Sequence, residues 1–240
     1  MRTILVVDIE TVRLENSDKI LEPFVASLRG VKPRKTKATS LMQMVSEDED
    51  KADIALKKAA LSPVSSRIAC IGVLRLIIDD HNKVSDSLKI FICDEDEENM
   101  LNDLKALITP TVEFVTFNGR SFDFPFLMYR AAILGIPLAL PMSSPYNGRD
   151  NHYDMFVHLN QLSNMSILSS MIEYVGLGKW CEHFGLPTKP SIKNGDISIE
   201  DMIARKAYDE LKEYCMGDVD ATAFLFTTFI GSIHVNSRYS

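Results

Sequence analysis

The sequence has few of the residues that build zinc sites and disulfide frameworks. It contains four cysteines and five histidines, and no two cysteines form a C-x-x-C pair. The cysteines lie far apart, at Cys70, Cys93, Cys181 and Cys215. Wide spacing of this kind is typical of reduced thiols inside cells. The tripeptide C-E-H at 181–183 lacks further ligands, so we expect neither a zinc centre nor a disulfide.

Long apolar runs are also missing. No stretch approaches the roughly 20 apolar residues that a membrane-spanning helix needs. The apolar run near the N-terminus, T-I-L-V-V, is too short for a secretory signal and is followed by an acid. The sequence therefore predicts a soluble, cytoplasmic protein with no membrane partner.

The chain has neither an excess of positive charge nor a glycine-rich nucleotide signature. The formal net charge is −7 and the pI is about 5.3, which argues against duplex DNA binding through bulk electrostatics. An acidic site that holds metal ions can still compensate its own charge locally. The segment G-L-G-K-W at 176–180 follows no strand and has no third glycine. A dehydrogenase or a kinase is therefore disfavoured.

What the sequence does contain is enough apolar material for the core of an α/β domain, since 46% of its 240 residues are hydrophobic. Strand-like runs are separated by runs with apolar residues three and four apart, which are typical of helices. The predicted strands cover residues 3–9, 67–78, 85–93, 112–118 and 151–159, with a turn at 79–83. Helices are predicted over residues 95–108 and 121–134, and Gly135 is expected to end the second of these. A long final helix is predicted from Ile199 to Phe229.

A polar and highly charged excursion, at residues 13–66, interrupts this order. It holds the acidic run E-D-E-D-K-A-D, and a short helix is predicted through residues 51–61. Its basic cluster comprises Arg29, Lys32, Arg34, Lys35 and Lys37. This cluster fits a solvated loop, and the second interpretation is a guide for a nucleic-acid strand.

Two acids end the first predicted strand, in the segment D-I-E-T. Side chains two residues apart on a strand point to the same face, so Asp8 and Glu10 project together. Asp123 stands at the start of a predicted helix, just after a strand. Tyr214 and Asp218 lie four residues apart and share one face of the last helix. If these elements converge, their carboxylates suit hard cations such as Mg²⁺ or Mn²⁺, a pair of which serves phosphoryl transfer.

Three motifs carry a family resemblance. The segments D-I-E at 8–10, N-x3-F-D at 118–123 and Y-x3-D at 214–218 resemble the three exonuclease motifs of the DEDD superfamily. The tyrosine is typical of its DEDDy branch. The segments F-N-G-R-S-F-D-F-P-F-L-M-Y-R-A, H-Y-D-M, H-F-G-L-P-T-K-P and Y-C-M-G-D-V-D-A-T resemble the stand-alone predicted 3′–5′ exonucleases related to the proofreading domain of family B DNA polymerases. The likeness covers residues 1–12 and roughly 67–230.

This resemblance implies a ribonuclease H-like fold, in which helices flank a mixed central sheet. It further implies one 3′–5′ exonuclease domain over residues 1–240, interrupted by the charged excursion. Asp8 would bridge two divalent cations, Mg²⁺ or Mn²⁺. Glu10 and Asp218 would complete the first cation site, and Asp123 would hold the second. Tyr214 would orient the attacking water.

The resemblance also implies a substrate. The backbone at Thr11 and the side chain of Asn118 would seat the terminal nucleotide, and Phe122 is a candidate for stacking on its base. The activity would be metal-dependent hydrolysis of phosphodiester bonds from the 3′ end of single-stranded nucleic acid, releasing nucleoside 5′-monophosphates. DNA is favoured and RNA stays open. A polymerase or a repair protein acting in trans is an open partner.

Two other functions compete with this one. An endonuclease on the same fold suits the motifs less well, because they resemble those of end-trimming enzymes. A non-catalytic nucleic-acid-binding module built on a nuclease fold would have lost ligands. All four acids and Tyr214 are present, which favours the exonuclease.

Several nearby residues have structural interpretations. Asp154 is an unassigned fifth carboxylate, for which capping or pairing with Arg149 competes with substrate contact. Asp220 fits the tyrosine spacing worse than Asp218 and is expected on a solvated helix face. Phe124, Phe126 and Trp180 are expected to pack in the core.

Overall fold

The computed structural model describes residues 1–14, 61–141, 151–163, 175–187 and 198–235, and within these ranges it describes the side chains of all residues but 162–163 and 231–235. The basic cluster and all but the last residue of the helix predicted for the charged excursion lie outside these ranges. The chain divides into two compact units, of which the first joins Met1–Glu10 to Ile68–Ser240 and the second is Thr11–Arg67. Within the second unit, the Leu14 N–H donates to the Ser65 carbonyl at 2.9 Å. That all 240 residues form one exonuclease domain stays a prediction.

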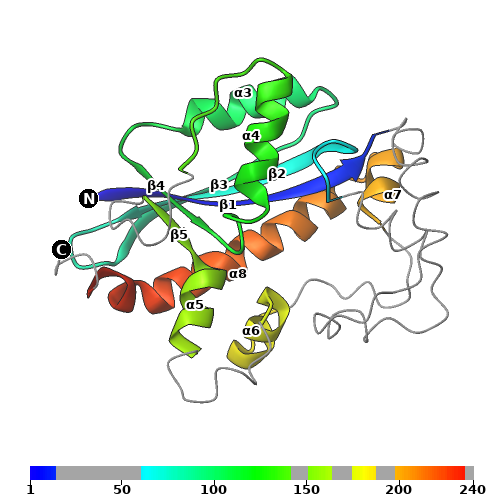
Figure 1. Ribbon diagram of the computed structural model, residues 1–240. Coiled ribbons are helices and arrows are strands. Elements are labelled where there is room, and N and C mark those ends of the chain that lie inside the picture. Colours follow the sequence, from blue (N-terminus) through cyan, green and yellow to red (C-terminus); the bar gives the residue numbers. More distant parts are fainter. Residues whose placement is uncertain (15–60, 142–150, 164–174, 188–197, 236–240) are drawn as a thin grey trace, which may run out of the picture. The chain divides into compact units, whose positions relative to one another are not determined.

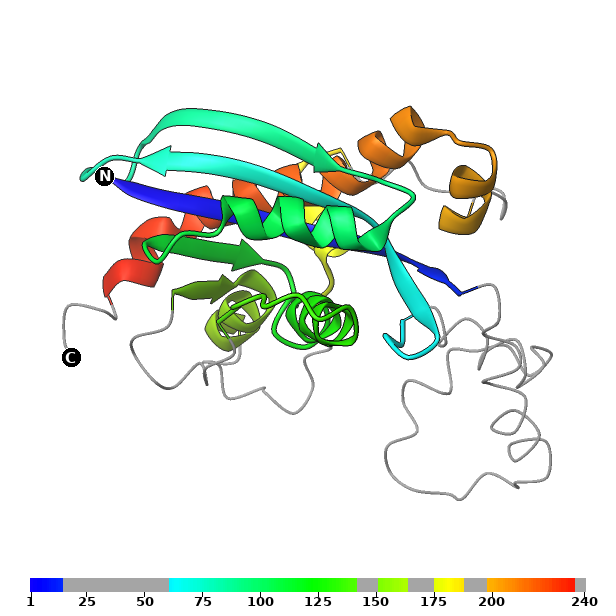
Figure 2. The same ribbon diagram turned by 90° about the horizontal axis from the view of Figure 1, so that it is seen from above.

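A mixed sheet of five strands is the centre of the fold. The strands are β1 (Arg2–Arg13), β2 (Ser66–Ile78), β3 (Val84–Ile92), β4 (Val112–Thr116) and β5 (His152–Asp154). Their order is β3-β2-β1-β4-β5, which Figure 2 shows from above. β2 and β3 are antiparallel, whereas β4 runs parallel to both β1 and β5. The predicted α/β fold with a mixed central sheet is confirmed.

The β2–β3 hairpin forms as predicted, and its turn follows from one side chain. Oδ1 of Asp79 accepts the backbone N–H groups of His81 and Lys83 at 2.9 and 2.8 Å. Asparagine tolerates the left-handed backbone conformation better than most residues, and Asn82 adopts it here with φ of 61°. The turn therefore reverses the chain where the sequence is rich in polar residues.

Helices cover both faces of the sheet. They are α3 (Glu97–Leu107), α4 (Asp123–Ile133), α5 (Met155–Ser163), α6 (Leu177–Phe184), α7 (Ile199–Ala204) and α8 (Tyr208–Val235). Figure 1 shows α3 and α4 on one face of the sheet and α5, α6 and α8 on the other. No helix in the described part of the chain is long and apolar enough to cross a membrane.

The central strand β1 is buried on both faces because it lies between two hydrophobic cores. Leu5, Val7 and Ile9 pack in the core under α3 and α4. Ile4 and Val6 pack in the opposite core, with residues of α5 and α8. The alternation of side chains along the strand therefore continues into its polar end, where even-numbered residues face α8.

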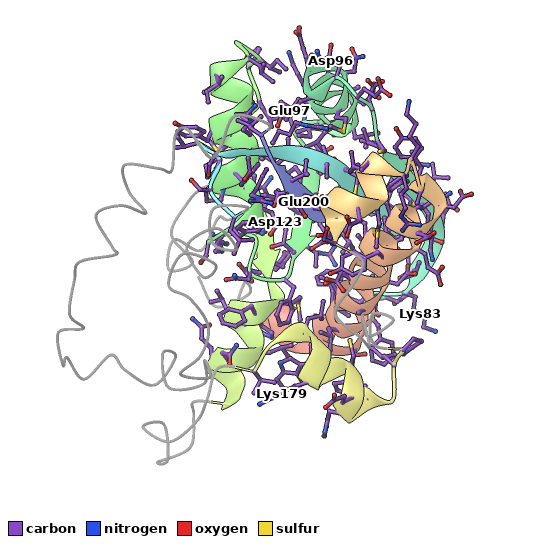
Figure 3. All side chains as sticks on the ribbon, turned by 90° about the vertical axis from the view of Figure 1, so that its right-hand side faces the viewer. Lys83, Asp96, Glu97, Asp123, Lys179 and Glu200 are labelled. Carbon is purple, nitrogen blue, oxygen red and sulfur yellow. The ribbon has the colours of Figure 1, made fainter. Side chains whose placement is uncertain are left out.

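A buried ion pair fixes α4 against α3. The Arg130 guanidinium donates to both carboxylate oxygens of Glu97, with Nε 3.0 Å from each. The same carboxylate accepts the backbone N–H of Ile68, at the start of β2, at 2.7 Å. A buried pair of charges needs such additional hydrogen bonds to offset its desolvation. Glu97 is labelled in Figure 3, on α3.

One strand prediction and one helix prediction need correction. The segment 151–159 is strand only over His152–Asp154, and α5 begins at Met155, because the Asp154 carboxylate caps the following backbone N–H groups. The long final helix is broken into α7 and α8, since Lys206 adopts a left-handed conformation with φ of 56°. The prediction that Gly135 ends α4 is confirmed, with φ of 70°.

Helix α8 comes close to the sheet at a residue without a side chain. A Cβ added to Gly72 of β2 would lie 2.8 Å from Val219 Cγ2 and 2.9 Å from Cys215 Sγ, both on α8. These distances are shorter than side chains in a packed core tolerate. Glycine at this position therefore sets how close α8 lies to β2.

Replacing Gly72 with alanine should push α8 away from the sheet. Overpacking of this kind costs about 1–3 kcal/mol of stability, so we expect G72A to melt several degrees below wild type. Gly217, an exposed residue on the same helix, has no atom within 4 Å of its added Cβ. The control G217A should therefore keep or raise the melting temperature, because alanine favours helices over glycine. Equal melting of G72A and wild type would contradict the close approach.

Candidate functional site

Three carboxylates from two elements meet at one end of the sheet. Asp8 and Glu10 lie on β1 and Asp218 lies on α8. Each of the three offers a carboxylate oxygen, and these oxygens all lie within 4.8 Å of one another. All three side chains are half-buried. The structure thus brings together three of the four acids that the sequence motifs singled out.

The convergence follows from strand alternation and helix placement. Asp8 and Glu10 continue the row of β1 side chains that faces α8. On α8, Met216 and Val219 pack in the core beneath β1, which holds this turn of the helix, and Asp218 with it, close to the sheet. Cys215 reinforces the position, because its Sγ lies 4.0 Å from the Asp8 carbonyl oxygen.

Two buried thiols flank the carboxylates. A hydrogen bond with Cys70 and burial raise the pKa of the Cys215 thiol, and the charges of Asp8 and Glu10 add to the rise. On α6, burial and the charge of Asp218 raise the pKa of the Cys181 thiol. No sequence pattern indicated this proximity, because the thiols and the acids come from segments far apart in the chain.

The donor set of this cluster suits a hard divalent cation. Like charges at such distances repel strongly when they are partly removed from water. All members are carboxylates, and the described residues offer no histidine or cysteine to the same group. Oxygen-only ligand sets are typical of Mg²⁺ and Mn²⁺, whereas Zn²⁺ sites usually include nitrogen or sulfur. The cluster therefore fits the cations that the motifs predict.

The fourth acid, Asp123, is not a member of this group of three. It is the first residue of α4, only 3% exposed, and its Oδ1 accepts the backbone N–H of Ile9 at 3.1 Å. Ile9 stands between Asp8 and Glu10 on β1, so the bond places Asp123 directly beside the cluster. Asp123 is labelled in Figure 3, which shows the molecule from the side on which β1 ends in Figure 1.

The bond to Ile9 has a simple origin in the sheet. The register of β1 with β4 ends at the pair Val6 and Val115, although β1 continues beyond this point. The Ile9 N–H would then be a buried donor without a strand partner, which is costly. The Asp123 carboxylate takes the place of the missing strand.

The environment of Asp123 disfavours its charge. Burial raises the pKa of Asp123 from 3.8 to about 7, against the backbone hydrogen bonds from Ile9 and from its own N–H, which lower it. The negative charges of Asp154 and Glu10 contribute to this rise. A cation bound nearby would act in the opposite direction and favour the carboxylate.

The loop between β4 and α4 carries two of the predicted substrate residues. Asn118 is half-buried and adopts a left-handed backbone conformation, with φ of 67°. Phe122 precedes α4, is half-buried, and packs against Phe126 with the ring centroids 5.7 Å apart. A role of Phe122 in base stacking stays a prediction. Phe124 and Phe126 are fully buried, as predicted.

The remaining predicted site residues lie on β1 and α8. Tyr214 is half-buried on α8, one turn before Asp218, and packs against a small core around Cys70, Met202 and Leu211. Thr11 follows Glu10 on β1 and is largely buried, but it belongs to the second compact unit. The nucleotide-seating role of Thr11 therefore stays a prediction.

Two further acids behave as structural residues. The Asp154 carboxylate is buried and accepts four backbone N–H groups, which confirms its use as a cap. Asp220 forms a surface ion pair with Lys89 at 2.6 Å, in line with its predicted place on a solvated helix face. Trp180 packs against the core beside α8, as predicted.

One histidine has a structural role that the sequence did not indicate. His152 is buried, accepts or donates a hydrogen bond through Nε2 to the Thr116 hydroxyl at 2.8 Å, and stacks on the Phe124 ring. Burial and the charge of Arg120 lower the pKa of His152 to about 3. The imidazole is therefore neutral at physiological pH, which suits a packing residue better than an acid or a base.

The mixed sheet, its strand order and its flanking helices define the fold class of ribonuclease H-like exonuclease domains. Among solved structures, the chain is similar to the family B DNA polymerase from the hyperthermophilic archaeon Pyrobaculum calidifontis, with a TM-score of 0.55 and 18% identity. This likeness covers 96% of the chain but 25% of the polymerase. E. coli Exonuclease I in complex with a dT13 oligonucleotide matches with a TM-score of 0.47 and 12% identity, over 95% of the chain and 41% of the exonuclease.

The chain belongs to the family described as "Predicted 3'-5' exonuclease related to the exonuclease domain of PolB", whose model matches residues 61–234. This match contains Asp123, Tyr214 and Asp218 but begins after Asp8 and Glu10. Asp8 and Glu10 lie on β1, which is the central strand of the sheet, and this position brings them to the other acids. Comparison with curated proteins gives no match.

The raised pKa of Asp123 makes the stability of the metal-free protein dependent on pH. The fold favours the protonated form of Asp123. The stability that this preference contributes is therefore complete below pH 3.8 and is lost as the pH rises through about 7. The D123N variant cannot ionise at this position and so does not lose this stability, and its amide oxygen can still accept the Ile9 N–H. In EDTA we expect D123N to be more stable than wild type at pH 8, by up to about 4 kcal/mol.

The measurement is urea unfolding of both proteins in EDTA between pH 4 and pH 8. The advantage of D123N should be small at the acidic end and should grow as the pH rises. A difference that stays constant over this range would show that Asp123 ionises in the fold as it does in the unfolded chain.

Proposed function

We propose that this protein is a metal-dependent 3′–5′ exonuclease that hydrolyses phosphodiester bonds at the 3′ end of single-stranded nucleic acid, with DNA favoured and RNA open, and releases nucleoside 5′-monophosphates. The convergence of Asp8, Glu10 and Asp218 in a chain of this family carries the proposal. A family relationship alone would leave the chain free to have lost its chemistry. Three clustered carboxylates are costly to keep without a cation to bind.

The proposal assigns two divalent cations, Mg²⁺ or Mn²⁺, to these acids. Asp8, Glu10 and Asp218 would hold the first, and Asp123, beside Asp8 and Glu10 at the Ile9 amide, would hold the second together with Asp8. Such cations lower the pKa of water and stabilise the charge that develops on a phosphoryl group during displacement.

The protein would contribute rigid placement. β1 is held in two cores, and α8 is fixed against β2 at Gly72, so the carboxylates from these elements have little freedom to move apart. Preorganised ligands of this kind avoid the cost of reorganisation when charge develops. Tyr214, one turn from Asp218, would use its hydroxyl to orient the attacking water.

Substrate selection follows from end recognition and from charge. Asn118, Thr11 and Phe122 are proposed to seat the terminal nucleotide. The net charge of −7 gives the chain no general attraction for duplex DNA. A single-stranded 3′ end, which can thread into a small site, is therefore the substrate that we propose.

Removing one carboxylate of the cluster should abolish cleavage without unfolding the protein. D218N should lower the rate of 3′-end trimming by several orders of magnitude, because a cation ligand is lost. D220N is a matched control, since Asp220 lies two residues away on the same helix and pairs with Lys89 at the surface. D220N should retain nearly full activity.

The assay uses 5′-labelled single-stranded DNA and RNA with Mg²⁺ or Mn²⁺ and then with EDTA. We expect a metal-dependent ladder that shortens from the 3′ end and is absent for D218N. Cleavage by D218N at the D220N rate would contradict the assignment. If wild type binds the oligonucleotides and cleaves neither, the protein is a binding module.

Tyr214→Phe tests the proposed role of the hydroxyl. Loss of a group that positions the nucleophile should slow hydrolysis by about 100-fold or more, while Mn²⁺ binding measured by electron paramagnetic resonance stays unchanged. Tyr208→Phe is the control, since Tyr208 is a partly exposed tyrosine of the same helix, two turns earlier. Equal rates for the two variants would assign water orientation to another group.

A further inference from the structure

Asp154 connects the candidate site to a helix that carries none of its residues. Its carboxylate lies at the end of β5 and is 4% exposed. Oδ1 accepts the Asn118 N–H at 2.9 Å and Oδ2 accepts the Arg120 N–H at 3.0 Å, both in the loop between β4 and α4. Oδ1 also accepts the N–H groups of Phe156 and Val157, in the first turn of α5, at 3.1 and 3.4 Å.

Oδ1 therefore serves both the loop and the helix, whereas Oδ2 serves the loop alone. The contacts with Phe156 and Val157 cap α5, which is a common use of an aspartate. The contacts with Asn118 and Arg120 hold a loop that belongs to another part of the sequence. Capping would account only for the two helix bonds of Oδ1, so its bond with Asn118 and the bond of Oδ2 with Arg120 have a separate function.

The loop needs this support because of its conformation. Asn118 adopts φ of 67°, which is uncommon for residues other than glycine. The next residue, Gly119, is pressed against Thr116, whose Oγ1 would lie 2.3 Å from an added Cβ. The Arg120 guanidinium reaches back to the carbonyl of His152 at 2.7 Å. The loop is thus tightly folded between β4 and β5, with Asp154 at its centre.

This loop delivers two residues to the candidate site. Asn118 is the proposed contact of the terminal nucleotide, and Asp123 follows at the end of the loop, bonded to Ile9 of β1. The amide that Asp154 holds most closely is that of Asn118 itself. A shift of the loop would therefore move the nucleotide contact and the fourth acid together.

We propose that Asp154 is a positioning residue for the exonuclease reaction, which fixes Asn118 and Asp123 by holding the backbone of the loop before α4. The inference rests on the proposed function for its effect on catalysis. Misplacement of reacting groups by small distances and loss of supporting hydrogen bonds each lower activity by about 10- to 100-fold.

Asp154→Asn tests the proposal with a side chain of the same size. Asparagine offers one acceptor oxygen where aspartate offers two, so it loses the bond that Oδ2 makes with the Arg120 N–H and places an amide donor against that N–H. We expect kcat/KM on single-stranded DNA to fall about 10- to 100-fold. Amide hydrogen exchange measured by mass spectrometry should rise in the peptide that contains residues 117–122.

Asp154→Ser separates the two functions and serves if D154N does not fold. Serine can cap α5 with its single short hydroxyl, but it lacks an oxygen that reaches Arg120. The control is Asp96→Asn, because Asp96 caps α3 by accepting the Glu98 N–H at 2.9 Å and contacts no residue of the loop. D96N makes the same change at a capping aspartate away from the loop, and it should keep both its activity and its loop protection, since asparagine can still cap α3.

The outcomes are distinguishable. Unchanged hydrogen exchange of the loop in D154N and D154S would overturn the positioning role, whatever their activity. Faster loop exchange with kcat/KM within twofold of D96N would overturn the link to catalysis. Absence of cleavage by wild type on every substrate would refute the proposed function, while the exchange experiment would still decide whether Asp154 holds the loop.

Discussion

The hydrogen bond from the Ile9 N–H to the Asp123 carboxylate is the contact on which the geometry of the candidate site depends. β1 extends past the end of its pairing with β4, and a buried donor is left at this point. An aspartate at the start of α4 satisfies that donor. One bond thereby fixes β1, α4 and the spacing between Asp123 and the two acids on either side of Ile9.

This arrangement lowers the stability of the metal-free protein. Three carboxylates lie within 4.8 Å of one another, and a fourth is buried beside them with its pKa raised to about 7. A fold optimised for stability alone would not collect these charges in one place. The surrounding structure is correspondingly firm, with two cores around β1 and the buried pair of Glu97 and Arg130 behind α4.

The sequence predicted the parts of the site that depend on local geometry. Strand alternation placed Asp8 and Glu10 on one face, and helical spacing placed Tyr214 one turn from Asp218. The meeting of β1 with α8 rested on family resemblance, because no local pattern reports contacts across some 200 residues. Gly72 and the Asp123–Ile9 bond were not predicted for the same reason. The break at Lys206 was missed because neither glycine nor proline marks it.

The central claim is that Asp8, Glu10 and Asp218 form a divalent cation site. The most direct test of this claim is a crystal structure of the protein with Mn²⁺, in which an anomalous difference map locates the bound ions. The account predicts a Mn²⁺ peak in direct contact with oxygens of these three carboxylates. Ordered carboxylates with no peak between them, in a crystal that shows Mn²⁺ bound elsewhere on the protein, would contradict it.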